Sequence, residues 1–243
     1  GVIVPVAFVG AYERALFIIS SVLGLVGQIN ARFAYSLINR IKHNVEKTIL
    51  LINRGVLLNL VLGGGFSLVA IFYLKSLIIF FLGEKWLVTG GILPYFSVYL
   101  IAIIPGVFIR QVFYAEKDPL HIVWGRLMEI GFFLLATGAL YQFSSAGNYS
   151  RALKFMAVSL GFSTMIGAGY LSSILLRLNQ LKRASLLKPL FSLVTAGALG
   201  GLMAVLFGLS IPVAGTGAVL FFVITVRITC RSDFAWLKRF WEA

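Results

Sequence analysis

The chain has 243 residues, of which 60% are hydrophobic and 12% are charged, and its mean hydropathy is +0.97. Soluble proteins carry about 25% charged residues, so this composition excludes a water-soluble fold. The formal net charge of +13 does not indicate a nucleic-acid partner, because the basic residues form short clusters beside long apolar segments. The apolar runs do not alternate with polar residues, which excludes a β-barrel. We therefore expect an all-α, polytopic transmembrane helical bundle.

Seven apolar segments are long enough to cross a bilayer, which takes about 20 residues of helix. In chain order they are residues 10–31, 55–82, 89–114, 120–142, 153–177, 187–209 and 212–230. Pro119, Pro189 and Pro212 predict the starts of three helices, because a first helical turn does not need the N–H that proline lacks. Pro94 and Pro105 predict a bend in the third span, where each removes a backbone hydrogen bond.

Two connecting segments combine basic and apolar residues. Residues 38–54 carry Ile, Val and Leu at roughly helical spacing among Lys and Arg, and residues 234–243 carry Phe and Trp beside Lys and Arg. This pattern is typical of helices that lie at a membrane surface. We expect both segments to anchor the protein at the interface.

The distribution of Lys and Arg predicts how the chain crosses the membrane. If the seven spans cross the membrane in alternating directions, 16 of the 21 basic residues lie on one side. Short loops that are rich in Lys and Arg remain in the cytoplasm. The C-terminus is therefore expected in the cytoplasm. The opposite side has only Arg14, Lys75, Lys85, Arg151 and Lys154.

Sequence motifs of enzymes are missing. There is no phosphate-binding loop, no dinucleotide fingerprint, no pair of histidines at helical spacing and no paired acidic motif. His43 and His121 are far apart in the chain. We expect neither catalysis nor a metal or other cofactor.

Ionisable residues inside the spans are the candidate functional residues, because an unpaired charge is costly in a bilayer. Glu129 lies about ten residues into the fourth span, and Arg126, three residues earlier, is on the same helical face. The two residues could form a proton- or cation-sensitive site, or a cationic patch that holds an anionic headgroup. They could equally form a salt bridge that anchors a helix at the interface. Glu13 and Arg14 open the first span, where pairing at the interface is expected.

Small residues recur at four-residue spacing in several spans, such as Ser163 with Gly167 and Gly197 with Gly201. This spacing lets membrane helices approach one another closely. We expect these positions to be helix contacts.

The order of three segments resembles a known family. They are GAYERALFIISSVLGLVGQINARFAYSLINR (residues 10–40), FFLGEKW (80–86) and GGILPYFSVYLIAIIPGVFIRQVFYAEKDP (90–119). A Gly-x-Tyr that opens a helix, a Leu-Gly-x-x-Trp that closes a later one and a long span leading to a basic turn are similar to the C-terminal half of polysaccharide and O-antigen flippases. These flippases belong to the multidrug/oligosaccharidyl-lipid/polysaccharide exporter superfamily.

The resemblance implies a transporter of two helical lobes that flips a lipid-linked oligosaccharide across the cell inner (cytoplasmic) membrane by alternating access. Residues 1–243 would be the second lobe, and the N-terminal lobe of a longer protein would be missing. The nearest candidates for binding the substrate's pyrophosphate are Arg14 and Arg126, with Glu129 beside Arg126. The implied partners are membrane lipids, the lipid-linked oligosaccharide and other proteins that assemble cell-envelope polysaccharide such as lipopolysaccharide.

Three other functions stay open. A multidrug exporter of the same superfamily would be favoured by acidic residues in the missing lobe. A membrane-embedded transferase acting on a lipid-linked donor would need His121, Arg126 and Glu129 to converge near one membrane face. A structural subunit would have no site at all.

Overall fold

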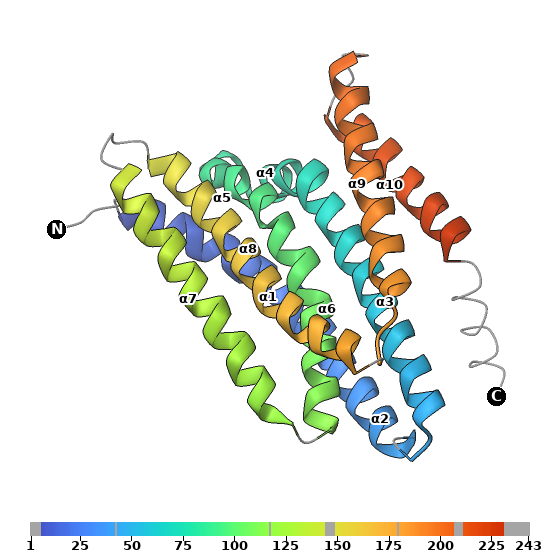
Figure 1. Cartoon of the computed structure of the whole chain (residues 1–243). Helices are drawn as coiled ribbons and strands as arrows, with labels where there is room; N and C mark the ends of the chain where they lie inside the picture. The colour runs from blue at the N-terminus through green and yellow to red at the C-terminus, as the bar shows by residue number, and fades with distance from the viewer. Residues whose placement is uncertain are drawn as a thin grey trace.

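The computed structural model of the protein describes residues 6–41, 43–116, 118–143, 149–178, 180–206 and 211–230, and every regular element in these ranges is helical (Figure 1). Five helical stretches within them are long and apolar enough to cross a membrane: Val9–Asn30, Val45–Leu82, Glu84–Ala115, Pro119–Gly138 and Arg151–Arg177. Two shorter apolar helices follow, Leu186–Gly200 and Val213–Thr229. The expected all-α membrane bundle is confirmed.

The elements follow one another with short connections. In chain order they are α1 (Val6–Asn30), the π-helical turn η1 (Ala31–Tyr35), α2 (Ser36–Ile41), α3 (Val45–Val69), the π-helical turn η2 (Ala70–Leu74), α4 (Lys75–Leu82), the 3₁₀ turn η3 (Glu84–Trp86), α5 (Leu87–Ile92), the 3₁₀ turn η4 (Leu93–Phe96), α6 (Ser97–Ala115), α7 (Pro119–Phe143), α8 (Tyr149–Arg177), α9 (Arg183–Leu206) and α10 (Ile211–Thr229).

The expected surface helix over residues 38–54 is wrong. The Asn44 side chain accepts a hydrogen bond from the Lys47 N–H at 3.0 Å, which caps a new helix at this point. That helix, α3, continues through η2 and α4 to Leu82, so its first turns belong to a stretch of 38 residues. Ile52 and Asn53 are buried in the bundle and do not face a membrane surface. The second anchor expected, residues 234–243, lies outside the described residues.

The prolines mark helix starts in two of three cases. Pro119 opens α7 and Pro212 is the second residue of α10, as expected. Pro189 is different, because α9 already begins at Arg183 and runs through it. Pro189 is the seventh residue of α9, an interior position where a proline removes one backbone hydrogen bond and crowds the preceding turn. The helix start expected at Pro189 is therefore wrong.

In the third span, where a bend was expected, the structure has a change from α-helix to a 3₁₀ turn. Pro94 lies in η4, which separates α5 from α6, whereas Pro105 lies inside α6 and does not end it. The α-helix is therefore interrupted at Pro94 and not at Pro105.

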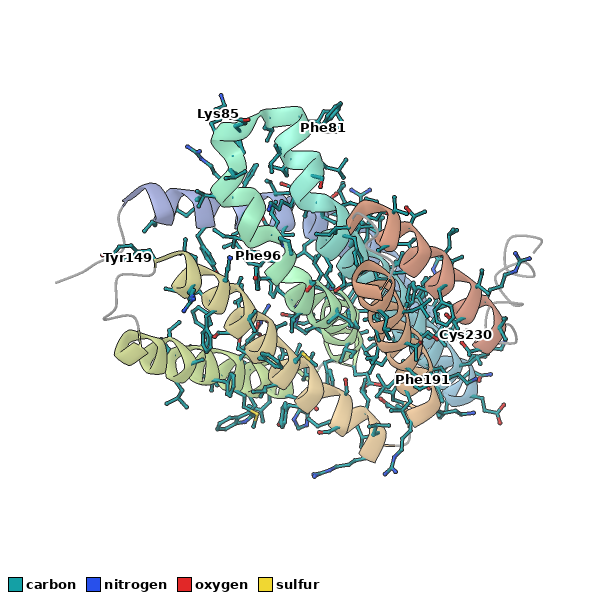
Figure 2. All side chains as sticks on the ribbon, turned by 90° about the horizontal axis from the view of Figure 1, so that it is seen from above. Phe81, Lys85, Phe96, Tyr149, Phe191 and Cys230 are labelled. Carbon is teal, nitrogen blue, oxygen red and sulfur yellow. The ribbon has the colours of Figure 1, made fainter. Side chains whose placement is uncertain are left out.

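Helix α6 is the centre of the bundle. It packs against α3 on one side and α8 on the other, α7 covers α8, and α9 with α10 forms a pair against α3 (Figure 1). The view from above shows Phe96 among the helices, and Phe81 and Lys85 at the projecting turn between α4 and α5 (Figure 2). The described core is therefore formed by side chains between helices, as in other helical membrane proteins.

The connections of the bundle gather at two ends. The α2–α3, α6–α7 and α8–α9 turns lie at the lower end of Figure 1, and the α4–α5 turn lies at the upper end. The described basic residues of these connections divide between the ends in the alternation that the sequence predicts. The side of the membrane that each end faces stays a prediction, and labelling tests it.

We expect Lys85→Cys, at the α4–α5 turn, to react with a membrane-impermeant maleimide in intact cells, and Lys47→Cys, at the start of α3, to react only after permeabilisation. Both lysines are exposed, and the background is Cys230→Ser, which removes the one native cysteine. Labelling of both variants from the same side would contradict the topology.

Candidate functional site

Arg126 and Glu129 form an ion pair on α7, as the sequence predicts. The Arg126 Nη1 atom lies 2.6 Å from Glu129 Oε2. The two side chains differ in exposure, since 47% of Arg126 is accessible and only 11% of Glu129. The pair therefore connects a buried carboxylate with a guanidinium that reaches the edge of the bundle.

The second oxygen of Glu129 is bound from α8. Thr164 donates its hydroxyl to Glu129 Oε1 at 2.8 Å, and this contact is buried. Each carboxylate oxygen thus has a donor, which is what a buried carboxylate requires. Thr164 could not be identified from the sequence, because the contact joins residues 35 positions apart in the chain.

Glycine lets α7 and α8 come close enough for this contact. A Cβ atom added to Gly167 would lie 2.8 Å from the backbone oxygen of Gly125 and 3.5 Å from Glu129 Oε2. Any larger residue would push α8 away from the carboxylate. The expected role of Gly167 as a helix contact is confirmed.

Arg110 on α6 is a candidate residue that the sequence did not single out. Only 8% of it is exposed, and it interacts electrostatically with Glu129, which attracts it, and with Arg126, which repels it. A Cβ atom added to Gly106 would lie 3.6 Å from Arg110 Nη1 and 3.4 Å from the Cβ of Ala168 on α8. Its side chain is therefore among α6, α7 and α8. From the sequence, Arg110 is one of the 16 basic residues expected on the cytoplasmic side.

The guanidinium of Arg110 has no hydrogen bond or ion pair to another residue within the described parts of the chain. Arg110, Arg126 and Glu129 together carry a net charge of +1, and we call these three residues the charge cluster. A buried arginine that lacks a bonded acceptor is costly. The charge cluster therefore has unused capacity to bind an anionic group.

Arg14 lies elsewhere. Its guanidinium carbon is 5.1 Å from the centre of the Trp86 ring, in a cation–π contact between α1 and η3. No contact within the described residues brings Arg14 to Arg126 or Glu129. Of the three substrate-binding candidates from the sequence, the structure brings together only the two on α7.

His121 also has different partners. Its Nδ1 lies 3.3 Å from the Tyr170 hydroxyl and its Nε2 lies 3.5 Å from Asp118 Oδ2. No described contact joins it to Arg126 or Glu129, so these three residues do not form the convergent site that a transferase would require. Among the described residues, no three of His, Cys, Asp and Glu gather as metal ligands would.

An apolar cavity of about 280 Å³ lies between α3, α6, α8 and α9. Its lining includes Leu60, Pro105, Ile109, Ala168 and Leu190. Ala168 also contacts the region of Gly106 and Arg110, so the cavity and the charge cluster lie on adjoining sides of the α6–α8 contact. An apolar chain and an anionic group of one ligand would each find a suitable environment here.

No family model, curated protein or solved structure matches this chain. The charge cluster and the apolar cavity beside it are therefore the features of the molecule from which a function can be inferred.

We expect Gly167→Ala to lower the melting temperature of the purified protein, since the new methyl group meets the Gly125 carbonyl and forces α7 and α8 apart. Overpacking of this kind costs about 1–3 kcal/mol. The control is Gly169→Ala on the same helix, where a Cβ meets nothing within 4 Å. That change should raise stability by up to about 1 kcal/mol through helix propensity. Equal effects at both positions would contradict the close contact at Gly167.

Proposed function

We propose that this chain is one lobe of a transporter that flips a lipid-linked oligosaccharide across the cytoplasmic membrane. In this proposal the charge cluster binds the phosphate groups that join the sugar to its lipid. The chain provides one wall of the transport path, and a second lobe, in the longer protein that the resemblance implies, provides the opposite wall.

The observation that carries the proposal is the burial of Arg110 in a membrane-spanning helix without a bonded acceptor. A guanidinium remains charged in proteins and matches the geometry of phosphate with two parallel hydrogen bonds. Ionisable residues in such positions are usually part of a substrate path. A substrate with a diphosphate would supply the negative charge that the three residues of the charge cluster lack.

Two further features support a lipid-linked substrate. The apolar cavity beside the charge cluster is lined mainly by aliphatic side chains and by Pro105 and Ala168, which suits a polyprenyl chain. The three segments that resemble polysaccharide flippases lie between residues 10 and 119 and include all of α6. Arg110 itself belongs to the third of these segments.

An exporter of cationic compounds is the second candidate, and Glu129 favours it. Only 9% of the Glu129 residue is exposed. A buried carboxylate in a membrane-spanning helix can bind a cation or carry a proton. The two candidates differ in which charge is essential: Arg110 for an anionic substrate and Glu129 for a cationic one.

We expect Arg110→Gln to reduce flipping of a fluorescent lipid-linked oligosaccharide by the full-length protein in liposomes by about tenfold to a hundredfold, because a hydrogen bond to a charged group contributes about 1.5–3 kcal/mol. Arg110→Lys keeps the charge and should retain part of the activity. Lys85→Gln, which removes an exposed cation at the α4–α5 turn, is the control and should leave flipping unchanged.

Normal flipping by a folded Arg110→Gln protein would contradict the proposed role of the charge cluster. Loss of drug export in Glu129→Gln, with Arg110→Gln unaffected, would instead favour the exporter of cations. Absence of flipping by the parent protein would leave a structural role as the better account.

A further inference from the structure

Residues 75–92 form a helical hairpin at the upper end of the bundle, made of α4, the turn η3 and α5. We call these residues the upper hairpin. Gly83 connects its two helices with a φ of +83°, which glycine adopts without strain. Figure 2 shows the upper hairpin projecting from the side of the bundle, with Phe81 and Lys85 on opposite sides of its tip.

The regular α-helix is interrupted on both chains where the upper hairpin joins the bundle. Helix α3 passes into α4 through the π-helical turn η2, and α5 passes into α6 through the 3₁₀ turn η4, which contains Pro94. The turns η2 and η4 contact each other, so the two interruptions lie at the same level. The upper hairpin is therefore a unit distinct from α3 and α6.

The lengths of the neighbouring helices place this junction at the edge of the membrane. Helix α6 has 19 residues, which is about 28 Å at 1.5 Å per residue and close to the roughly 30 Å of a bilayer core. On the neighbouring chain, Arg54 and Lys75 are 21 residues apart, or about 31 Å at the same rise per residue. Both chains thus fill the core before they reach the upper hairpin.

Two cation–π contacts mark the same level. The Lys154 Nζ atom lies 5.4 Å from the centre of the Tyr95 ring in η4, and Arg14 lies over the ring of Trp86 in the upper hairpin. Trp and Tyr are enriched at the boundary between membrane and water, and long basic side chains extend toward that boundary. These contacts agree with the helix lengths, because they place the boundary at η4 and the upper hairpin.

Helix α4 presents apolar side chains that no described helix covers. None of its eight residues is buried, although six of them are Leu, Ile or Phe. Phe80 and Phe81 expose 81% and 74% of their surface. In contrast, α5 contacts α1 and buries Thr89, Gly90 and Ile92. The upper hairpin is therefore held to the bundle by α5, while α4 leaves two phenylalanines uncovered.

The size of the uncovered surface favours lipid over a second protein. The exposed large apolar residues of the upper hairpin are Leu77, Phe80, Phe81, Leu82, Leu87 and Val88. A stable protein–protein interface takes about 20–30 residues from each partner. Exposed aromatic and aliphatic residues beside lysine, at the edge of a membrane-spanning bundle, are instead typical of segments that lie at a lipid surface.

We propose that the upper hairpin lies along the surface of the phospholipid bilayer and inserts Phe80 and Phe81 among the lipid chains. Lys85, on the opposite side of the tip, remains in water. Surface-bound segments of this kind bury their apolar side about 5–10 Å into the boundary between headgroups and chains. Because α5 is fixed to α1, the inserted phenylalanines hold this end of the bundle at a constant depth.

The test measures the depth of nitroxide labels on the full-length protein in phosphatidylcholine bilayers. The labels are attached to Leu77→Cys, Phe81→Cys and Lys85→Cys, each in a cysteine-free background. Electron paramagnetic resonance compares relaxation by oxygen, which concentrates in lipid, with relaxation by a water-soluble nickel chelate. Leu135→Cys is the reference for lipid contact, since Leu135 exposes 74% of its surface within the membrane-spanning part of α7.

We expect oxygen to dominate relaxation at Leu77 and Phe81, as at Leu135, and the nickel chelate to dominate at Lys85. Dominance of nickel at both Leu77 and Phe81 would place α4 in water and overturn the proposal. Shielding of both labels from both reagents, with spin–spin broadening that disappears on dilution with unlabelled protein, would show a second copy at this surface and would also overturn it.

The role of the two phenylalanines is tested with the label at Leu77, which lies on the same face of α4 as Phe80 and Phe81 at spacings of three and four residues. Phe80→Ser combined with Phe81→Ser should shift this label from oxygen to nickel. The control, Phe80→Leu with Phe81→Leu, keeps apolar side chains and should leave it unchanged. An unchanged label in a folded serine variant would contradict insertion through the phenylalanines. If the serine variant does not fold, the labels on the parent sequence still decide whether α4 contacts lipid.

Discussion

The burial of Arg110 is the constraint on which the account of this protein depends. A guanidinium that lies among membrane-spanning helices must find negative charge, and the only acidic residue that interacts with it electrostatically within its described surroundings is Glu129. Glu129 is already bound by Arg126 and Thr164. The cluster is left with one more positive than negative charge among packed helices, where an uncompensated buried charge is costly. An anionic ligand would restore the balance, and this is the physical reason to assign the site to a phosphate-bearing substrate.

The helix packing makes this cluster possible. Small residues at Gly106, Gly125 and Gly167 bring α6, α7 and α8 together, so that three charged side chains and Thr164 share one region. The same α6–α8 contact borders the apolar cavity. One set of close helix contacts therefore positions both a polar and an apolar binding environment. The connections at the lower end of the bundle are joined differently, through hydrogen bonds of Asn53 and Gln180.

The sequence was sufficient for the all-helical class and the approximate positions of the apolar helices, because length and hydropathy determine what can cross a bilayer. Seven spans were expected, and five helices within the described residues are long and apolar enough, with two shorter apolar helices after them. The sequence was a less reliable guide where a single capping residue determines where a helix begins. The segment after residue 38 has the composition of a surface helix, but the Asn44 cap makes its second half the start of α3. The pair of Arg126 and Glu129 was predictable from its spacing on one helix. Arg110 was not, because an arginine a few residues from a basic turn looks the same in sequence whether it faces water or the bundle, and its neighbours come from α7 and α8.

The proposed function requires Arg110 to bind the anionic part of the substrate. The most direct measurement is the affinity of the purified full-length protein for a polyprenyl diphosphate, compared between the parent and Arg110→Gln at fixed salt concentration. If Arg110 binds the diphosphate, binding should be at least about tenfold weaker in the variant, because one charge-assisted hydrogen bond contributes about 1.5 kcal/mol or more. Equal affinity of a folded Arg110→Gln protein would contradict it.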